Sequence, residues 1–360
     1  MKACPLCGRS GSRELYRAQG LPIFQNKVYD DVAVARAAEV GDVVLAQCES
    51  CGFVFNAAFE PARMAYDATY QNEQSFSEAF QAHLDQVADI IISKAGPDQS
   101  ILEIGCGKGG FFDQLKKRGV RRIKGFDPAY EGEDTDIVKA YFGSGSLAEP
   151  ADFIVLRHTL EHIEAPLAFL HLIARANGYR GRILIEVPSF EWIVERAACW
   201  DVFYEHCNYF TRDTLWAFFR KSQWYGLFAG QHQAVIADLA DLVEEPGVAA
   251  PNMYDAFASV DARYAALLPG QATVFVWGAS SKGVTLCNHV DRSCTRIRGL
   301  IDINPAKQGR FTAVTGHPIF APSHLDGLAQ EQLTVLVTNP NYLREIREQT
   351  AHLHADFVTL

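Results

Sequence analysis

The stretch that decides the fold runs Ile101-Leu-Glu-Ile-Gly-Cys-Gly-Lys-Gly-Gly110. It begins as a short apolar strand, turns through closely spaced glycines and continues into a helix predicted over Phe111 to Arg118. Such a turn needs glycine because a ligand approaches the backbone where a side chain would collide. The pattern predicts a strand, a cofactor-binding turn and a helix in sequence.

Two cofactor classes fit these glycines. Gly105, Gly107 and Gly110 satisfy G-x-G-x-x-G, the fingerprint of dinucleotide-binding proteins. With Glu103 and Gly109, the same stretch also satisfies E-x-G-x-G-x-G, the pattern of class I methyltransferases. The glycines alone leave both readings open.

Two further features resemble class I methyltransferases. Glu103 on the strand is their hallmark, and in those proteins it helps to hold the methionine part of the cofactor. Asp152-Phe-Ile-Val-Leu-Arg-His-Thr-Leu-Glu-His-Ile163 is similar to their fourth-strand segment, where a Leu-Glu-His turn follows the strand. Asp127 ends the next strand 22 residues after Gly105 and can bond the ribose hydroxyls of either cofactor. The resemblance implies S-adenosylmethionine.

The implied cofactor residues lie in the glycine turn and at the ends of the neighbouring strands. Tyr141 and Phe142 follow the expected third strand, where an adenine often stacks. The full set is Glu103, Gly105, Cys106, Gly107, Gly109, Asp127, Pro128, Tyr141, Phe142 and His158.

Strand and helix signals alternate on both sides of this stretch. A helix is predicted over Ala65 to Lys94, where apolar residues recur at three- and four-residue spacing. Strands separated by helices imply a mostly parallel, doubly wound sheet. Its strands are expected at Ser100 to Ile104, Ile123 to Phe126, Ala151 to Leu156 and Arg182 to Val187.

A second strand, glycine turn and helix begins at Thr273 with Val-Phe-Val-Trp-Gly-Ala-Ser-Ser-Lys-Gly283. Strands at Ile297 to Ile301 and Leu333 to Val337 follow. These signals predict a second, smaller α/β domain.

Four of the nine cysteines form two pairs, Cys4-x-x-Cys7-Gly and Cys48-x-x-Cys51-Gly. Four thiolates suit a closed tetrahedral site for structural zinc. An odd number of cysteines and no secretory signal argue against a disulfide framework. Reduced, unligated cysteines or a redox pair are the alternatives.

The composition argues against nucleic acid and membranes as binding partners. The net charge is -10, and no basic run offers the counterion exchange that nucleic-acid binding needs. No apolar run approaches the roughly 18 residues of a membrane span. The N-terminus has no apolar core of the secretory kind. We expect a cytoplasmic enzyme acting on a small molecule; the oligomeric state is open.

The cysteine pairs, the Glu103 turn and the Gly278 turn follow one another in an order that resembles the sugar C-methyltransferases of deoxysugar and surface-polysaccharide pathways. Those proteins have an N-terminal four-cysteine zinc domain, a class I methyltransferase domain and a C-terminal Rossmann-like domain. The resemblance implies an α/β chain with these domains at residues 1–64, 65–245 and 246–360, the last binding substrate. Family members methylate a carbon beside a ketone on a nucleotide-linked sugar.

A carbon beside a ketone must lose a proton before it can attack a methyl group, and a histidine suits this step. The family's Tyr-x-Glu-His segment matches Phe203-Tyr-Glu-His206, which implies His206 as general base and Glu205 as a positioning or substrate-contacting group. Phe203 stands where the family has tyrosine, and Tyr204 could supply the hydroxyl from the adjacent position.

Further candidates come from the same resemblance. Tyr70 and Asn72 lie in a segment similar to a family substrate contact, and His162 is a second candidate acid or base. The turn from Gly278 could receive a phosphate at a helix N-terminus, with Ser280 and Lys282. A second bound dinucleotide is not expected.

Three other functions compete with C-methylation. The first is O- or N-methylation of a sugar or another small metabolite, which the missing hydroxyl at Phe203 favours. The second is an NAD-dependent dehydrogenase, against which Glu103 and the Leu-Glu-His turn speak. The third is a non-enzymatic zinc-containing binding module.

Overall fold

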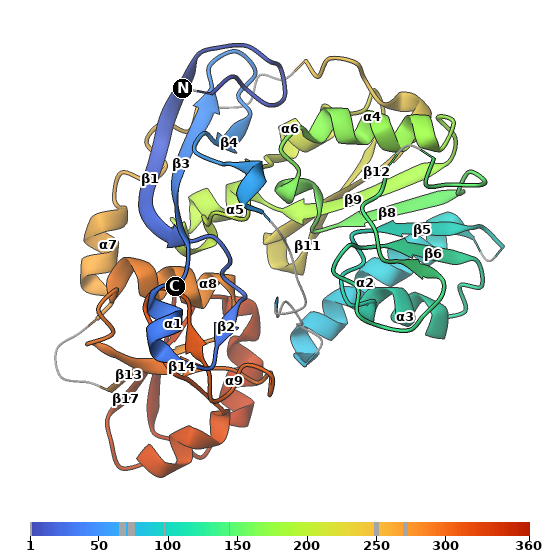
Figure 1. Cartoon of the computed structure of the whole chain (residues 1–360). Coiled ribbons are helices and arrows are strands. Elements are labelled where there is room, and N and C mark those ends of the chain that lie inside the picture. Colours follow the sequence, from blue (N-terminus) through green and yellow to red (C-terminus); the bar gives the residue numbers. More distant parts are fainter. Residues whose placement is uncertain are drawn as a thin grey trace.

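The protein is described by a computed structural model that covers residues 2–64, 70, 76–96, 98–143, 145–247, 252–268 and 273–360. Three large sheets organise the chain, one in the N-terminal part, one in the middle and one in the C-terminal part (Figure 1).

The middle sheet contains seven strands. Its five strands from β7 to β9 are parallel, whereas β12 runs antiparallel to both β9 and β11. This mostly parallel order confirms the predicted class I methyltransferase fold. In order across the sheet the strands are β11 (Gln223–Leu227), β12 (His232–Asp238), β9 (Arg182–Pro188), β8 (Phe153–Arg157), β5 (Ile101–Ile104), β6 (Ile123–Phe126) and β7 (Ile137–Val138).

Helices cover both faces of this sheet, because successive residues of a strand point to opposite faces. Phe153 and Val155 of β8 pack with α2 (Glu78–Ala95) and α3 (Gly110–Lys117). Ile154 and Leu156 pack with α4 (Pro166–Ala176) on the other face.

The predicted helix over Ala65 to Lys94 is wrong at its start. The Ser77 side chain accepts a hydrogen bond from the backbone N–H of Phe80 and caps α2, so the helix begins at Glu78. Before it, Tyr70 forms an isolated antiparallel bridge with Lys27.

The C-terminal sheet contains five parallel strands, which confirms a second α/β unit. Its helices are α7 (Val260–Ala266), α8 (Ser281–Val290) and α9 (Leu343–Gln349). In order across the sheet the strands are β16 (Ile319–Phe320), β14 (Ile297–Ile301), β13 (Thr273–Trp277), β17 (Leu333–Val337) and β18 (Ala355–Thr359).

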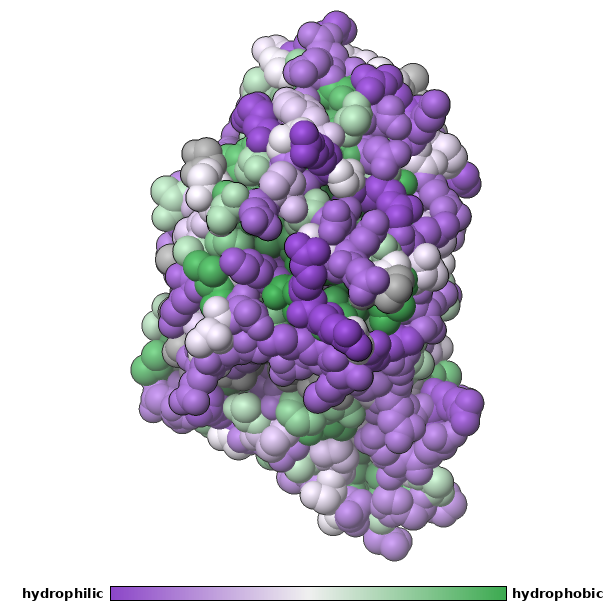
Figure 2. Space-filling view, turned by 90° about the vertical axis from the view of Figure 1, so that its right-hand side faces the viewer, coloured by the Kyte–Doolittle hydropathy of each residue, from purple (hydrophilic) through white to green (hydrophobic). Residues whose placement is uncertain are grey.

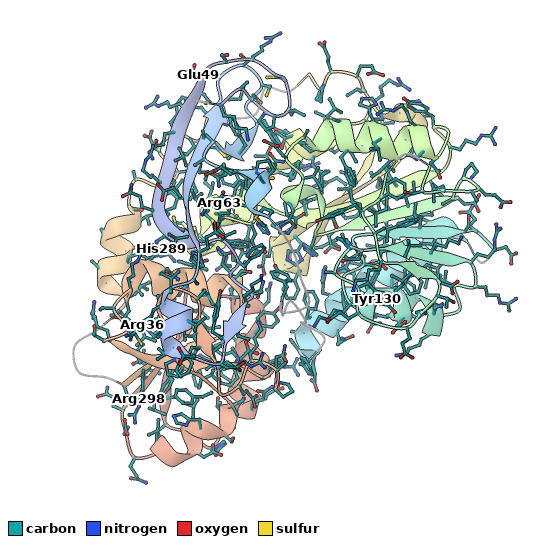
Figure 3. The ribbon with its side chains drawn as sticks, in the orientation of Figure 1. Arg36, Glu49, Arg63, Tyr130, His289 and Arg298 are labelled. Carbon is teal, nitrogen blue, oxygen red and sulfur yellow. The ribbon has the colours of Figure 1, made fainter. Side chains whose placement is uncertain are left out.

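The N-terminal sheet is antiparallel and takes its last strand from the middle of the chain. Its strands are β1 (Ser12–Pro22), β3 (Val40–Cys48), β4 (Val54–Asn56) and β10 (Asn208–Tyr209). β2 (Val28–Tyr29) leaves this sheet and pairs with β15 (Phe311–Thr312). Beside it, α1 (Val32–Arg36) brings Arg36 over the C-terminal part (Figure 3). Two pairings therefore cross the predicted boundaries at residues 64 and 245.

Short helices connect these elements. Two are α-helical, α5 (Phe190–Glu195) and α6 (Arg212–Trp216). The 3-10 turns are η1 (Pro61–Arg63), η2 (Leu160–His162), η3 (Cys199–Asp201), η4 (Phe228–Gly230), η5 (Leu239–Asp241), η6 (Pro322–Leu328) and η7 (Pro340–Tyr342).

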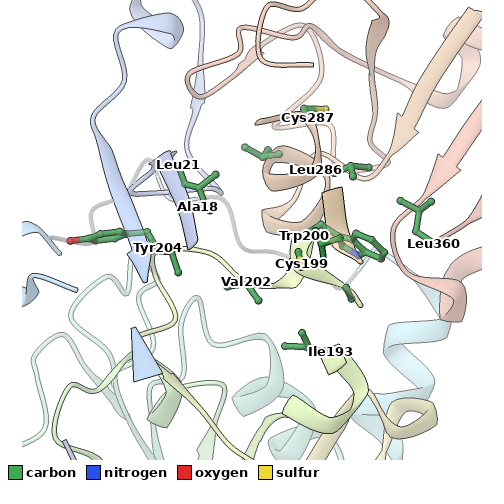
Figure 4. Packing of buried hydrophobic residues seen from close by; sticks show 14 of the residues in the cluster. Ala18, Leu21, Ile193, Cys199, Trp200, Val202, Tyr204, Leu286, Cys287 and Leu360 are labelled. Carbon is green, nitrogen blue, oxygen red and sulfur yellow. The ribbon is translucent and has the colours of Figure 1, made fainter. Parts of the chain in front are cut away.

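One hydrophobic core joins all three parts. Leu21 of β1, Trp200 of η3, Leu286 of α8 and Leu360 are buried in the same cluster (Figure 4). The Trp200 indole also donates a hydrogen bond to the carbonyl of Thr338 at 3.0 Å. Since these residues come from every part of the chain, the three sheets pack against one another as one body.

The surface is largely polar on the side formed by the middle sheet, where hydrophilic residues cover most of the face (Figure 2). Within the described ranges, every helix is too short or too polar to cross a membrane.

Candidate active site

A cavity of about 1000 Å³ lies outside the carboxyl ends of β5 and β8. Strand order reverses between these two strands, which is where open α/β sheets bind ligands. Phe59, Gly105 and Lys282 line the cavity, so all three parts of the chain contribute to its wall.

Most of the predicted site residues line this cavity. Those that do so are Tyr70, Glu103, Gly105, Cys106, Gly107, Asp127, Pro128, Tyr141, Phe142, His158, His162, His206, Gly278, Ser280 and Lys282. Gly109, Tyr204 and Glu205 do not line it. Asn72 lies outside the described residues.

The glycines of the cofactor turn have different tasks. Gly105 has φ +78°, and a Cβ there would lie 2.1 Å from the Thr159 hydroxyl oxygen. Gly107 has φ +58°, and its Cβ would meet nothing within 4 Å. Gly109, at φ +84°, caps α3 instead of lining the cavity. Gly105 permits close packing of the chain, while Gly107 leaves open space for a ligand.

Asp127 fixes the cofactor turn to the end of β6. Its Oδ2 accepts a hydrogen bond from the N–H of Gly107 at 2.8 Å, and its Oδ1 accepts one from the N–H of Ala129 at 2.8 Å. Burial raises the pKa of this carboxyl. Asp127 therefore shapes the turn as well as lining the cavity.

The environment of Glu103 shows whether the cavity suits S-adenosylmethionine. The residue is 2% exposed, lines the cavity, and its Oε2 has no hydrogen-bond partner among the described residues. Burial raises the pKa of Glu103 to about 7. A buried acceptor without a partner is costly unless a ligand supplies a donor, and the ammonium group of the cofactor is such a donor.

The two aromatic residues expected near an adenine differ. Phe142 is buried and packs edge-on against Phe126, with ring centroids 5.3 Å apart. Tyr141 is 71% exposed although it also touches the cavity. Phe142 is thus the better fixed of the two side chains at the cavity.

His206 and His162 meet inside the cavity. Their ring centroids are 4.9 Å apart in an edge-on arrangement, and His206 is 8% exposed. Burial, and next the neighbouring His162, lower the pKa of His206 well below its usual value. His162 Nδ1 lies 2.9 Å from the carbonyl oxygen of Glu205. A carbonyl only accepts, so Nδ1 donates this hydrogen bond.

Glu205 lies behind Tyr70 rather than in the cavity wall. Its Oε2 accepts a hydrogen bond from the Tyr70 hydroxyl at 2.5 Å, and its Oε1 accepts one from the N–H of Gln25 at 2.8 Å. Asn26 donates to Tyr70 at 3.2 Å and to Ser281 at 2.9 Å. Glu205 therefore positions Tyr70 within a network that spans the three parts.

Tyr204 does not supply the hydroxyl that Phe203 lacks. Its ring is fully buried beside Phe59, and its hydroxyl accepts a hydrogen bond from the N–H of Glu60 at 3.0 Å (Figure 4). Phe203 occupies the cavity side instead, with its ring centroid 4.1 Å from that of His206. The Tyr204 side chain therefore points away from the cavity.

The second glycine turn repeats the first in its bonding. Asp302 accepts hydrogen bonds from the N–H of Ala279 and the N–H of Asn304, both at 2.8 Å. Lys282 forms an ion pair with the buried Asp201. The lysine charge already has a partner in this structure, and the contact of Lys282 with a phosphate stays a prediction.

One cluster at the cavity was missed from the sequence. Glu186 is fully buried at the end of β9 and contacts Arg157, His83, His158 and His232. Arg157 and Glu186 stand near the carboxyl ends of adjacent parallel strands. That placement is a recognisable signal of a ligand-facing edge.

The four paired cysteines meet away from this cavity. Cys4 and Cys51 have their sulfurs 3.6 Å apart, and Cys7 and Cys48 have theirs 3.7 Å apart. Zinc–sulfur bonds of about 2.3 Å place the sulfurs of a tetrahedral site about 3.8 Å apart. These four thiols could hold a metal ion.

Two family models match the sequence. One describes a methyltransferase domain and matches residues 46–227. The other describes a C-methyltransferase C-terminal domain and matches residues 231–359. The C-methyltransferase NovU of Streptomyces niveus is 23% identical over 383 residues, covering 93% of this chain and 89% of that protein.

Solved structures give local similarities. A SAM-dependent methyltransferase from Thermotoga maritima has a TM-score of 0.32 at 18% identity, over 45% of this chain and 89% of that chain. The plantazolicin methyltransferase BpumL, solved with a triazolic desmethylPZN analog and SAH, has a TM-score of 0.27 at 18% identity, over 34% of this chain and 51% of that chain.

Proposed function

The chain belongs to the methyltransferase-domain family and is an S-adenosylmethionine-dependent methyltransferase, and from this we propose that it methylates a carbon beside a ketone on a nucleotide-linked sugar. The observation that carries the proposal is that His206 and the cofactor turn line the same cavity. The match of residues 231–359 to a C-methyltransferase domain supports carbon as the acceptor atom.

S-adenosylmethionine supplies an electrophilic methyl group when bound. The contribution of the chain is to make the acceptor carbon nucleophilic. His206 is neutral at pH 7, because its pKa is lowered by burial, so a ring nitrogen can accept the proton from the carbon beside the ketone. His162 is adjacent, with its ring edge-on to that of His206 and its Nδ1 donating to the Glu205 carbonyl. Proton removal is thus the step we assign to this pair.

The cavity has room for both reactants. Its volume of about 1000 Å³ is at the upper end of the range usual for pockets that hold a single small ligand. Tyr70, held by Glu205, faces it from one side, and the turn at Gly278 faces it from the C-terminal sheet. We assign the sugar to the region near His206 and its nucleotide to the C-terminal side.

The four cysteines complete the proposal. The sulfur separations of 3.6 and 3.7 Å fit zinc, which all four thiolates would hold without an open position. The ion therefore has a structural role and takes no part in methyl transfer.

O- or N-methylation is the second candidate. Phe203 favours it, because its ring lies against His206 and offers no hydroxyl to a keto-sugar. His206 could deprotonate an acceptor hydroxyl in the same position.

The proposal is tested by separating proton removal from methyl transfer. Wild-type protein, saturated with S-adenosylhomocysteine in D2O, should exchange the proton beside the ketone of a keto-sugar nucleotide. His206→Asn should slow this exchange about 100-fold or more without changing the affinity for S-adenosylhomocysteine. His171→Asn, whose native side chain bonds the Val243 carbonyl on α4's side of the sheet, is the matched control.

Product NMR then decides the acceptor atom. A new methyl group on carbon agrees with the proposal, and one on oxygen or nitrogen contradicts it. Exchange that proceeds unchanged in His206→Asn would remove His206 from the mechanism.

A further inference from the structure

We propose that His83, His158, Glu186 and His232 bind one divalent first-row transition-metal ion in the wall of the active-site cavity. The four residues come from four places: α2, the residue after β8, the end of β9 and the start of β12. His83, Glu186 and His232 are 3%, 0% and 8% exposed. His158 and His232 line the cavity.

The separations between the ligand atoms fit a tetrahedral site. Glu186 Oε1 lies 2.7 Å from His83 Nε2, 3.4 Å from His158 Nε2 and 3.5 Å from His232 Nδ1. His83 Nε2 and His232 Nδ1 are 3.4 Å apart. Metal–ligand bonds of about 2.0 Å give a tetrahedral edge of about 3.3 Å, which three of these four separations match. The cysteine sulfurs, 3.6 and 3.7 Å apart, match the edge of a tetrahedral zinc–sulfur site in the same way.

Hydrogen bonding alone leaves this cluster incomplete. His158 Nε2 is buried, and its contact with Glu186 Oε1 at 3.4 Å lacks hydrogen-bond geometry. The residue also adopts φ +46°, a left-handed conformation that favours glycine. Its N–H donates to the carbonyl of Glu186 at 2.9 Å, which holds this conformation beside the carboxylate. A metal ion would give this nitrogen a closer partner than the carboxylate.

Arg157 prepares the carboxylate for this role. Its Nε donates to Glu186 Oε2 at 2.6 Å, so the other oxygen, Oε1, is the one that faces the three imidazoles. Ligating carboxylates are commonly held in this way by a second hydrogen bond. Three imidazole nitrogens and one carboxylate oxygen suit zinc and its first-row neighbours, whereas Mg²⁺ and Ca²⁺ prefer oxygen ligands.

A second set of residues competes for the ion. Glu161, His162 and His206 also bring their ligand atoms within 4.8 Å of one another. Their two histidines are the pair to which we assign proton removal, and a bound ion would occupy the lone pair that accepts the proton. The Glu186 cluster offers four ligand atoms and would leave His162 and His206 without a metal ion, so we assign the ion there.

X-ray absorption at the zinc edge tests the proposal on the wild-type protein after extensive dialysis. With both sites filled, the average first shell contains equal numbers of sulfur and of nitrogen or oxygen neighbours, and elemental analysis gives two ions per chain. A single ion with a pure sulfur shell overturns the proposal, and this result needs no variant that could misfold.

Two double variants then locate the ion. His83→Gln with His232→Gln should lose one ion and leave a pure sulfur shell, whereas Cys4→Ser with Cys51→Ser should leave a shell of nitrogen and oxygen. His162→Gln with His206→Gln is the matched control and should keep both ions. Loss of the second ion in this control, and its retention in His83→Gln with His232→Gln, would overturn the assignment.

Discussion

Asp127 and Asp302 hold the two glycine turns through the same pair of backbone hydrogen bonds. Asp127 was recognisable from the sequence, because it ends the strand that follows the turn, 22 residues after Gly105. The ion-pair partners of the site side chains could not be predicted from the sequence. Lys282 is neutralised by Asp201, 81 residues earlier in the chain. Local spacing cannot predict such a pairing, since it depends on how η3 packs against α8.

The two glycines of the cofactor turn should respond differently to alanine. Gly105→Ala places a Cβ 2.1 Å from Thr159 Oγ1 and strains the backbone, so we expect a loss of about 2–4 kcal/mol of unfolding free energy. Gly107→Ala has only the backbone strain, about 1–2 kcal/mol, and should instead weaken S-adenosylhomocysteine binding. Urea unfolding and calorimetric titration measure the two effects. Equal losses of stability would contradict this division.

His289 on α8 should make the fold sensitive to acid. It lies between β1 and the C-terminal sheet, near Tyr16 and stacked on Tyr264 (Figure 3). Burial lowers the pKa of His289 to about 4, below the 6.5 of an unfolded histidine. The unfolded chain therefore takes up the proton first, and stability falls as the pH drops from about 6.5 to about 4.

The His289 contribution is measured by urea unfolding between pH 7 and pH 5. In His289→Gln the unfolding free energy should fall less between these two pH values. The part that is removed is about 1.4 kcal/mol for each pH unit between the unfolded and folded pKa values of His289. The exposed His354→Gln is the control. An unchanged slope in His289→Gln would show that other groups cause the acid sensitivity.

At the scale of elements, the N-terminal sheet is closed at one end by the cysteine pairs. Cys48 ends β3 and Cys51 lies in the turn before β4, while Cys4 and Cys7 precede β1. The motif spacing predicted that the four would meet. It could not predict β10, because a two-residue strand in an aromatic-rich segment carries no period that distinguishes it from a loop.

We expect the zinc proposed for the cysteine site to stabilise this sheet, so its removal should destabilise the sheet. A ligand present at about 1,000 times its Kd stabilises the folded state by about 4 kcal/mol. Cys4→Ser with Cys51→Ser should lower the unfolding free energy by a similar amount. Cys294→Ser, outside the site, is the control. Equal unfolding curves for the two variants would mean that the site contributes no stability.

At the scale of the whole molecule, the sequence predicted three consecutive domains, whereas the sheets exchange strands and share one core. Seven of the twelve strands of the two α/β units followed from hydrophobic runs and turn residues, whereas β7, β11, β12, β16 and β18 did not. The shared core did not, because each of its members looks like an ordinary buried residue of its own sheet. The cavity depends on this packing, since residues from all three parts line it.

Trp200→Ala tests whether the three parts unfold together. Trp200 is fully buried, and truncating such a side chain costs about 3–5 kcal/mol. We expect a single calorimetric transition that moves as a whole to lower temperature. Trp216→Ala, at a residue 39% exposed, should have a much smaller effect. Two separate transitions, only one of them shifted, would contradict a common core.

The pairing of β2 with β15 has a consequence for the order in which the protein is made. A ribosome releases Val28–Tyr29 long before Phe311–Thr312, and at about 5–20 residues per second the delay is roughly 14–57 s. The first sheet likewise waits for Asn208–Tyr209. The beginning of the nascent chain is thus among the last regions to reach its final structure, and its unpaired strand edges stay open to chaperones during most of translation.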